Sequence, residues 1–120
     1  MSKVNRSEPR FEVIWKARVS SGFAPVLHVS IHNASSHGLR VISEVPFDDS
    51  QELTINLICK NSRRLAAFTL KSKVVYCKHF DDRMGYKLGV SISEPPSEYL
   101  KLIDKMEQEG HPVYESRSGV

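Results

Sequence analysis

Apolar and polar residues alternate along most of the chain between positions 11 and 92. Alternation with a period of two is typical of β-strands that bury one face. In the first run, residues 11–19, apolar side chains recur at every second position, although Ile14 places one on the opposite face. Further strands are expected at about residues 26–32, 39–43, 53–59, 65–77 and 86–92. Segments rich in Gly, Ser, Asn and Asp separate these runs and predict short turns.

The period changes after residue 93, which indicates a helix. Apolar side chains at intervals of three and four residues share one helical face, and they are Tyr99, Leu102, Ile103 and Met106. The two prolines at 95–96 are typical of a first helical turn, and Gly110 is typical of a helix end. We therefore predict an amphipathic helix over residues 94–109.

About six short strands followed by one helix predict a mainly β fold, a six-stranded antiparallel barrel with the helix closing one end or side. The 120 residues are enough for a single domain. Within it we expect a polar, mobile N-terminal arm at residues 1–10, the barrel at 11–92, the helix at 94–109 and a flexible tail at 110–120.

The composition, with 40% hydrophobic and 26% charged residues, is that of an ordinary soluble globular protein. The chain has no run of about 18 apolar residues, so no membrane insertion is expected. Its start is polar and lacks the apolar core of a signal peptide, which favours a cytoplasmic location. The two cysteines, Cys59 and Cys77, lie in expected strands, and two buried reduced thiols are favoured over a disulfide or a metal site.

The net charge of +3 permits an anionic partner but does not require one. The basic residues are scattered along the chain, whereas a general DNA- or RNA-binding protein is expected to carry a denser basic stripe. A compact anion is therefore a better match than a nucleic acid.

The expected arm contains the first of two patterns that carry binding chemistry. Arg6 and Arg10 lie about 13 Å apart in an extended chain, a spacing that suits two ends of one bulky anion. The arginine fork fits phosphates and the O6/N7 edge of guanine, and its face stacks on bases. The alternative for this pair is a solvated basic tail.

The second pattern is the stretch at residues 33–38, which separates two expected strands and predicts a turn. Asn33 offers an amide that donates and accepts, Ser35 a hydroxyl, and Gly38 a position without Cβ where the turn or a ligand crowds the backbone. Taken alone, a plain turn between strands explains the same residues.

The arginine pair before the first strand and the polar stretch between the second and third strands together resemble the two motifs of the PilZ domain family. The residues that match are Arg6, Arg10, Asn33, Ser35 and Gly38. Each motif is short, but their order, spacing and strand context make the combination specific. The resemblance extends to the later strands and covers about residues 5–108.

The resemblance implies a six-stranded split barrel with one C-terminal helix that binds cyclic di-GMP without catalysis. In such a site, Arg6 and Arg10 would hold phosphates and guanine edges. Asn33 and Ser35 would make polar contacts to a guanine, and Gly38 would hold the turn. The ligand would order the arm over the barrel mouth and so create or hide a face for an unidentified effector protein. The protein would be a monomer or a ligand-dependent dimer.

Secondary contacts are expected from three further residues. Ser36 and His37 lie inside the second motif, where His37 faces either ligand or solvent. Tyr76 stands where the family often has an aromatic residue beside a base, and packing in the core is the alternative for this side chain.

No metal, other cofactor or catalytic activity is expected. His28 and His32 would lie about 13 Å apart on a strand, too far to share an ion. Cys77 and His79 share a strand face, but no further ligands follow them. No phosphate loop, carboxylate pair or activated nucleophile stands out, so we do not expect an enzyme.

Two other functions are compatible with the sequence. One is a PilZ-like adaptor that acts through protein contacts without nucleotide, and the intact pair of motifs argues against it. The other is a small barrel that binds single-stranded nucleic acid through exposed aromatic residues. The outer faces of the expected strands carry few aromatics, which disfavours this function.

Overall fold

The computed structural model describes residues 8–22, 25–61, 64–80 and 84–113. The tips of two predicted turns, at residues 62–63 and 81–83, lie outside these residues. Within the described part the chain forms six strands and one helix. The strands are β1 (Phe11–Ser20), β2 (Leu27–Ala34), β3 (Gly38–Ser43), β4 (Glu52–Asn61), β5 (Arg64–His79) and β6 (Tyr86–Ser93), and the helix is α1 (Ser97–Gln108).

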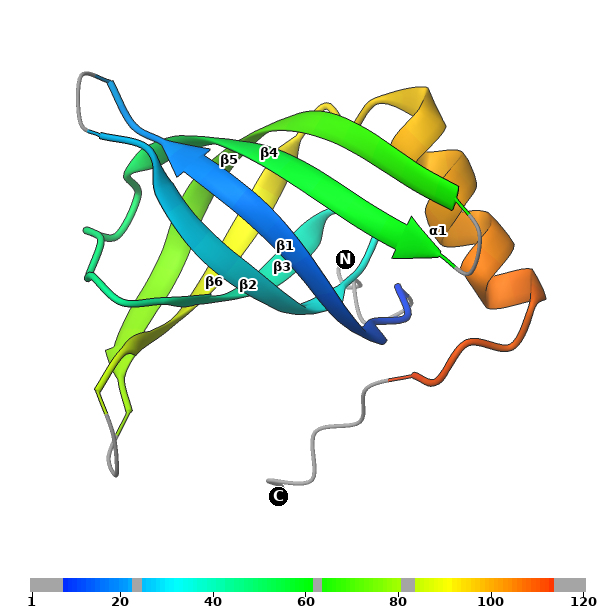
Figure 1. Cartoon of the computed structure of the whole chain (residues 1–120), viewed down its shortest axis with the longest axis horizontal. Coiled ribbons are helices and arrows are strands. Elements are labelled where there is room, and N and C mark those ends of the chain that lie inside the picture. Colours follow the sequence, from blue (N-terminus) through cyan, green and yellow to red (C-terminus); the bar gives the residue numbers. More distant parts are fainter. Residues whose placement is uncertain (1–7, 23–24, 62–63, 81–83, 114–120) are drawn as a thin grey trace, which may run out of the picture.

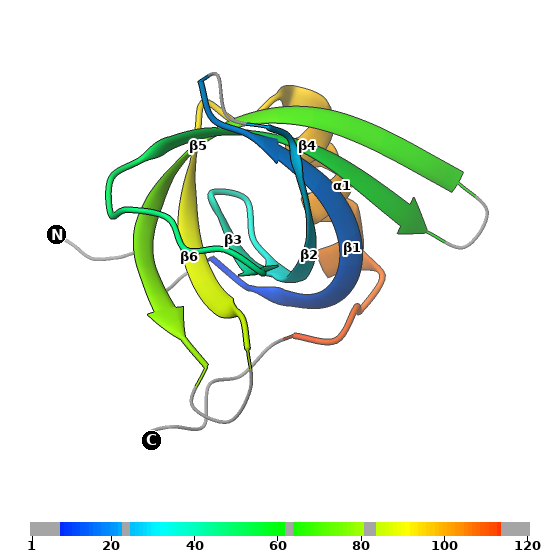
Figure 2. The ribbon, with the colours of Figure 1, turned by 60° about the vertical axis from the view of Figure 1, so that its left-hand side comes forward.

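The six strands close into an antiparallel barrel in the order β1-β2-β3-β6-β5-β4, with β4 returning to pair with β1. Figure 1 shows the strands crossing obliquely, and Figure 2 shows them arranged as a ring. Closure gives each strand a paired neighbour on both sides over part of its length, so no strand is left as a free edge strand along its whole length. The fold class predicted from the sequence, a six-stranded antiparallel barrel with one helix, is confirmed.

The inward-facing side chains of all six strands form one core, which the helix completes. The largest of the fully buried residues are Tyr99, Phe11, Ile31, Leu39, Ile55, Leu57, Leu70, Leu88 and Met106. Helix α1 contributes Tyr99, Ile103 and Met106 to this core, as its predicted apolar face requires. It runs beside the ends of β4 and β5 that their connection joins (Figure 1), and the Tyr99 ring meets Phe68 of β5 edge-on at 5.6 Å between centroids.

The helix is shorter than predicted because it begins at Ser97 rather than at residue 94. Pro96 is the N-cap and has an extended backbone, with φ −61° and ψ 147°. A residue that precedes proline is disfavoured in the helical region, so the helix cannot include Pro95 at low cost. At the other end, Gly110 adopts φ 73° and its N–H donates to the carbonyl of Glu107, which ends the helix.

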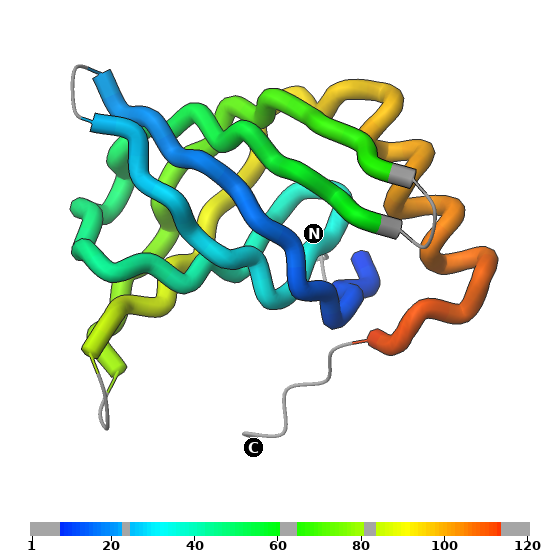
Figure 3. Tube along the Cα trace, in the orientation of Figure 1, coloured from blue at the N-terminus to red at the C-terminus, as the bar shows by residue number. Residues whose placement is uncertain are grey.

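The segment after the helix returns to the start of β1. The N–H of Glu12 donates to the carbonyl of Pro112 at 3.0 Å, and Phe11 pairs with Val113 in an antiparallel bridge. Pairing between β1 and β4 begins only at Lys16, so this segment covers the part of β1 that β4 leaves unpaired. Figure 3 shows the two stretches approaching each other below the barrel.

Three register shifts interrupt the otherwise regular pairing of the described strands. They lie between Glu12 and Trp15 in β1, between Ile31 and Asn33 in β2, and between Val74 and Tyr76 in β5. A β-bulge of this kind adds a residue to one strand and re-aims the side chains beside it. Ile14 lies within the first bulge on the outer face, as the alternation predicted, and is 86% exposed.

The bulge in β2 moves Asn33 to the outer face of the barrel. Regular alternation after Ile31 would place Asn33 inward and opposite Leu39. Instead Asn33 pairs with Arg40 on β3 and with Glu12 on β1, and residues directly opposite each other share a face. Ala34 takes the inward place opposite Leu39.

The buried thiol of Cys59 makes the alkaline stability of the barrel testable. Burial raises the pKa of Cys59 from 9.0 to about 12, so the thiol ionises in the unfolded chain first. Stability conferred by the buried thiol should therefore be complete below pH 9 and decline towards pH 12, by up to about 1.4 kcal/mol per pH unit. We expect the free energy of unfolding in urea to fall less steeply between pH 9 and 11 in Cys59→Ala than in the wild type.

Cys77→Ala, which removes the half-buried second thiol, is the matched control and should follow the wild type. Parallel pH profiles for Cys59→Ala and the wild type would contradict this assignment.

Candidate functional site

The polar stretch at residues 33–38 is only partly a turn, which corrects the expectation from the sequence. Asn33 and Ala34 are the last residues of β2, and Gly38 is the first of β3, so the turn itself is residues 35–37. The sequence pattern missed this because the bulge lets pairing continue past His32. The N–H of Ser35 donates to the carbonyl of Gly38 at 2.9 Å and closes the turn.

Two neighbouring elements hold this turn in place. The hydroxyl of Tyr99 on α1 donates to the carbonyl of Ser35 at 2.6 Å, and the N–H of Ile92 on β6 donates to the carbonyl of His37 at 2.9 Å. Burial raises the pKa of Tyr99 far above its ordinary value, so its hydroxyl stays protonated and remains a donor. The helix therefore fixes the position of the turn as well as closing the core.

The side chain of Asn33 faces outward but is only 1% exposed. Its Oδ1 accepts a hydrogen bond from Nη1 of Arg10 at 2.9 Å. Arginine is only a donor, which fixes the amide oxygen towards it. The Nδ2 of Asn33 is then a buried donor with no hydrogen-bond partner among the residues that the structure describes.

Gly38 lies beneath the same arginine. A Cβ added at this position would lie 3.2 Å from Nη2 of Arg10 and 3.3 Å from the carbonyl oxygen of Val90. The absence of a side chain therefore lets the guanidinium approach the backbone of β3. The glycine provides room for Arg10, a more specific role than holding the turn.

The described part of the arm contacts the turn at a second point. A carboxylate oxygen of Glu8 lies 2.7 Å from Nδ1 of His37, and both side chains are partly exposed. Residues 8–10 thus lie against the β2–β3 connection (Figure 3). Arg6, the other arginine of the predicted pair, lies outside the described residues.

These residues border a cleft of about 320 Å³ on the outer surface of the barrel. It is lined by Glu8, Arg10, Ser35, His37, Gly38, Val75, Val90 and Ser91. The structure thus brings together Arg10, Ser35 and Gly38, which the sequence singled out, and places Asn33 directly behind Arg10. Ser35 is buried, and its hydroxyl makes only a long contact of 3.4 Å to the carbonyl of Gly38.

Sequence reasoning missed four residues that line the cleft: Glu8, Val75, Val90 and Ser91. Val75 is the extra residue of the β5 bulge, and it is 59% exposed although it is apolar. Ser91 lies directly opposite Gly38 on the neighbouring strand. Val75 and Ser91 belong to neither sequence motif, so only the pairing of β5, β6 and β3 shows that they lie beside the cleft.

The three predicted secondary contacts have different surroundings. His37 lines the cleft, and Ser36 is half-buried with its hydroxyl 3.2 Å from Nδ1 of His37. Tyr76 lies on the outer face beside the cleft, with its ring packed over Gly89 so closely that a Cβ there would overlap it. Nζ of Lys78 lies 5.7 Å from the centroid of the Tyr76 ring.

Other chemistry is sparse in the described part of the chain. There, no group of three or more His, Cys, Asp or Glu side chains is arranged to hold a metal ion. Cys59 and Cys77 are both free, with Cys59 buried and Cys77 half-buried. Within the same residues, no helix has the length and apolar character needed to cross a membrane.

A closed six-stranded barrel with a C-terminal helix, an N-terminal arm and a polar β2–β3 connection defines the class of this protein. The chain matches the family model described as PilZ domain over residues 5–107, and it belongs to that family. No curated protein sequence shows significant similarity to it.

Solved structures share this fold at low sequence identity. The Bacillus subtilis inhibitor of motility MotI/DgrA superposes with a TM-score of 0.77 at 12% identity, over 90% of this chain and 52% of that chain. The PilZ domain of YcgR from Escherichia coli, solved with c-di-GMP, has a TM-score of 0.66 at 11% identity, over 89% of this chain and 95% of that chain. The K. pneumonia MrkH–c-di-GMP complex has a TM-score of 0.66 at 14% identity, over 91% of this chain and 53% of that chain. The present chain spans about half the length of the MotI/DgrA and MrkH chains.

The bond from Tyr99 to the turn can be tested by removing one oxygen. Tyr99→Phe leaves the buried carbonyl of Ser35 without this donor, so we expect a loss of about 1–2 kcal/mol in the free energy of unfolding in urea. Amide hydrogen exchange at residues 35–38 should also become faster. Tyr86→Phe is the control, because its hydroxyl makes no hydrogen bond to the described residues. Equal stability of the two variants would contradict the role of Tyr99.

Proposed function

We propose that the protein binds cyclic di-GMP in the cleft between the arm and the β2–β3 connection, as a receptor without catalytic activity. The observation that carries this proposal is the position of Arg10, which is held against Asn33 and lies over Gly38 at the edge of the cleft. The two sequence motifs thus contribute to one site, although 23 positions separate Arg10 from Asn33.

The chemistry of the cleft suits this ligand. Cyclic di-GMP carries two phosphates and two guanines, so it offers acceptors for the planar fork of Arg10. The Nδ2 of Asn33 is a buried donor without a partner among the described residues, in the same amide that accepts from Arg10. A small shift of Arg10 on binding would make it a donor for a guanine edge or a phosphate. The exposed aliphatic side chain of Val75 offers an apolar surface for a base. We assign a second arginine contact to Arg6 from the motif alone.

Proteins of the same fold support the ligand and the mode of action. The YcgR PilZ domain and MrkH were both solved with c-di-GMP, and MotI/DgrA is named as an inhibitor of motility. By analogy, we propose that the bound ligand rearranges the arm and that the altered surface signals to an effector protein in the cytoplasm. We expect the protein to be a monomer or a ligand-dependent dimer.

The two alternative functions fit the structure less well. A platform for single-stranded nucleic acid needs exposed aromatic rings. In the described part of the chain, the large exposed apolar side chains are Ile14, Val26, Ile58, Leu65, Val75, Met84, Leu100 and Val113, none of them aromatic. An adaptor that does not use nucleotide would have no reason to keep a buried amide and a glycine beneath an arginine.

Calorimetry with cyclic di-GMP, GTP and a short oligonucleotide tests the proposal. We expect the wild type to bind only cyclic di-GMP. Arg10→Ala removes charge-assisted contacts and should weaken binding by about 2–3 kcal/mol, or roughly 30- to 150-fold. Ser35→Ala should weaken it by about 1 kcal/mol. Arg18→Ala, at an exposed position on β1 opposite Asn56, is the matched control and should bind like the wild type.

Binding of the oligonucleotide without binding of cyclic di-GMP would exclude the proposed function. Equal losses in Arg10→Ala and Arg18→Ala would show that net charge, not the cleft, governs affinity.

The carboxylate of Glu8 lies in the same cleft and should oppose an anionic ligand. Its contact with His37 is partly exposed and contributes at most about 1 kcal/mol to holding the arm. We therefore expect Glu8→Gln to bind cyclic di-GMP about threefold more tightly at low ionic strength, with a smaller gain at high salt. His37→Gln, which keeps the carboxylate but removes its partner, should bind more weakly. If calorimetry shows weaker binding of cyclic di-GMP in both variants, the contact between Glu8 and His37 instead serves to hold the arm in place.

A further inference from the structure

A row of directly paired residues leads from the candidate site across the outside of the barrel. Gly38 of β3 lies opposite Ser91 of β6, Ser91 lies opposite Lys73 of β5, and Lys73 lies opposite Glu52 of β4. Residues paired in this way share one face of the sheet. Adjacent strands are separated by about 4.8 Å, so the backbone of Lys73 lies about 10 Å from that of Gly38.

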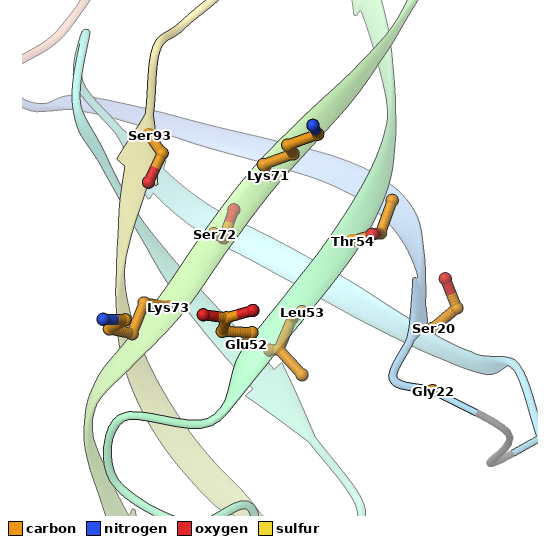
Figure 4. A pocket seen from close by; sticks show the side chains of 9 residues that line it. All are labelled: Ser20, Gly22, Glu52, Leu53, Thr54, Lys71, Ser72, Lys73 and Ser93. Atoms are coloured by element: carbon orange, nitrogen blue, oxygen red, sulfur yellow. The ribbon is translucent and has the colours of Figure 1, made fainter.

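Lys73 is not among the residues that line the cleft, but two of its neighbours are. Its neighbour across the strands, Ser91, and its neighbour two residues along β5, Val75, both line the cleft. The side chain of Lys73 is exposed and extends from β5 towards β6 (Figure 4), the strand that carries the cleft-lining Ser91.

The ammonium group of Lys73 has no ion-pair partner in the described part of the chain, although Glu52 is its direct cross-strand neighbour. Figure 4 shows the Lys73 side chain directed away from the Glu52 carboxylate. A cation that lies beside a cleft without a carboxylate partner is available to an anionic ligand.

We infer that Lys73 is a further contact for the ligand and binds the phosphate at the end of the cleft remote from Arg10; this rests on the proposed function. A cyclic dinucleotide carries two phosphates on opposite sides of one ring, and the row of paired residues runs from Gly38, beneath Arg10, through Ser91 to a second cationic side chain, Lys73. Lysine suits this place because its ammonium is a point charge on a long flexible stem, which reaches a phosphate without needing bidentate geometry.

Lys71 provides a matched control on the same strand. It is exposed on the same outer face, two residues from Lys73, but its cross-strand neighbours are Ser93 and Thr54, and neither of these lines the cleft. Together with Lys73 it borders a separate hollow of about 510 Å³ over β4 and β5 (Figure 4), which also contains the Glu52 carboxylate.

Calorimetry with cyclic di-GMP at two ionic strengths tests the contact. Lys73→Met keeps most of the apolar stem, and it should bind about 5- to 20-fold more weakly than the wild type with a smaller dependence on salt. Lys73→Glu should bind still more weakly, and Lys71→Met should stay within about twofold of the wild type. In the wild type, the ¹H–¹³Cε signal of Lys73, assigned from the Lys73→Met spectrum, should shift on addition of cyclic di-GMP more than that of Lys71.

Each outcome is decisive. A wild type that binds while Lys73→Met binds equally well overturns the contact but leaves the proposed function standing. Equal losses in Lys73→Met and Lys71→Met also overturn it, because they indicate a general effect of charge. A wild type that does not bind cyclic di-GMP overturns the proposed function, and the inference with it.

Discussion

The hydrogen bond between Arg10 and Asn33 is the interaction on which the candidate site depends. An amide on the outer face of a barrel is ordinarily solvated, yet Asn33 is almost fully buried. Burying such a group is costly unless it is hydrogen-bonded, and Arg10 satisfies its oxygen at 2.9 Å. This bond fixes the guanidinium over Gly38, where a side chain would meet it at 3.2 Å. One contact therefore explains three features: the position of Arg10, the requirement for glycine at position 38 and the Nδ2 of Asn33 that has no partner among the described residues.

The barrel makes this contact possible through its irregularities. The bulge in β2 turns Asn33 outward, and the bulge in β5 adds Val75 to the floor of the cleft. Regular pairing would leave Asn33 in the core and Val75 inside the ladder. Neighbouring elements hold the turn at residues 35–37 in place, since Tyr99 of α1 and Ile92 of β6 each donate a hydrogen bond to it. A rigid scaffold thus carries a site that is built at its few deviations from regularity.

These deviations also explain what the sequence could and could not predict. Alternation is a local signal, so the strands, the apolar face of α1 and the fold class followed from it. The outward position of Ile14 followed from the alternation as well. A bulge, however, depends on pairing with another strand, so the position of Asn33 within β2 could not be predicted. The start of α1 at Ser97 follows from Pro96, because a proline disfavours the helical conformation of the residue before it. Resemblance to the PilZ motifs identified Arg10, Asn33, Ser35 and Gly38, and the structure brings them together. The motifs did not indicate that Asn33 accepts a hydrogen bond from Arg10, nor that Lys73 lies opposite Ser91, because both depend on how distant segments pack and pair.

The distribution of charge around the cleft bears on the choice of ligand. The net charge of +3 is too small to select an anion by long-range attraction. Selection must instead arise from local contacts. The cleft is lined by a carboxylate, Glu8, and by Arg10, and the proposed contact of Lys73, beside Ser91, adds a second cationic edge. A small single anion reaches only one cationic edge and still meets the field of Glu8. A ligand with two separated phosphates contacts both edges at once, and its second contact is intramolecular and costs little further entropy. Under the proposed function, the opposed carboxylate and the spaced cations therefore favour a cyclic dinucleotide over the more abundant monophosphates and inorganic anions.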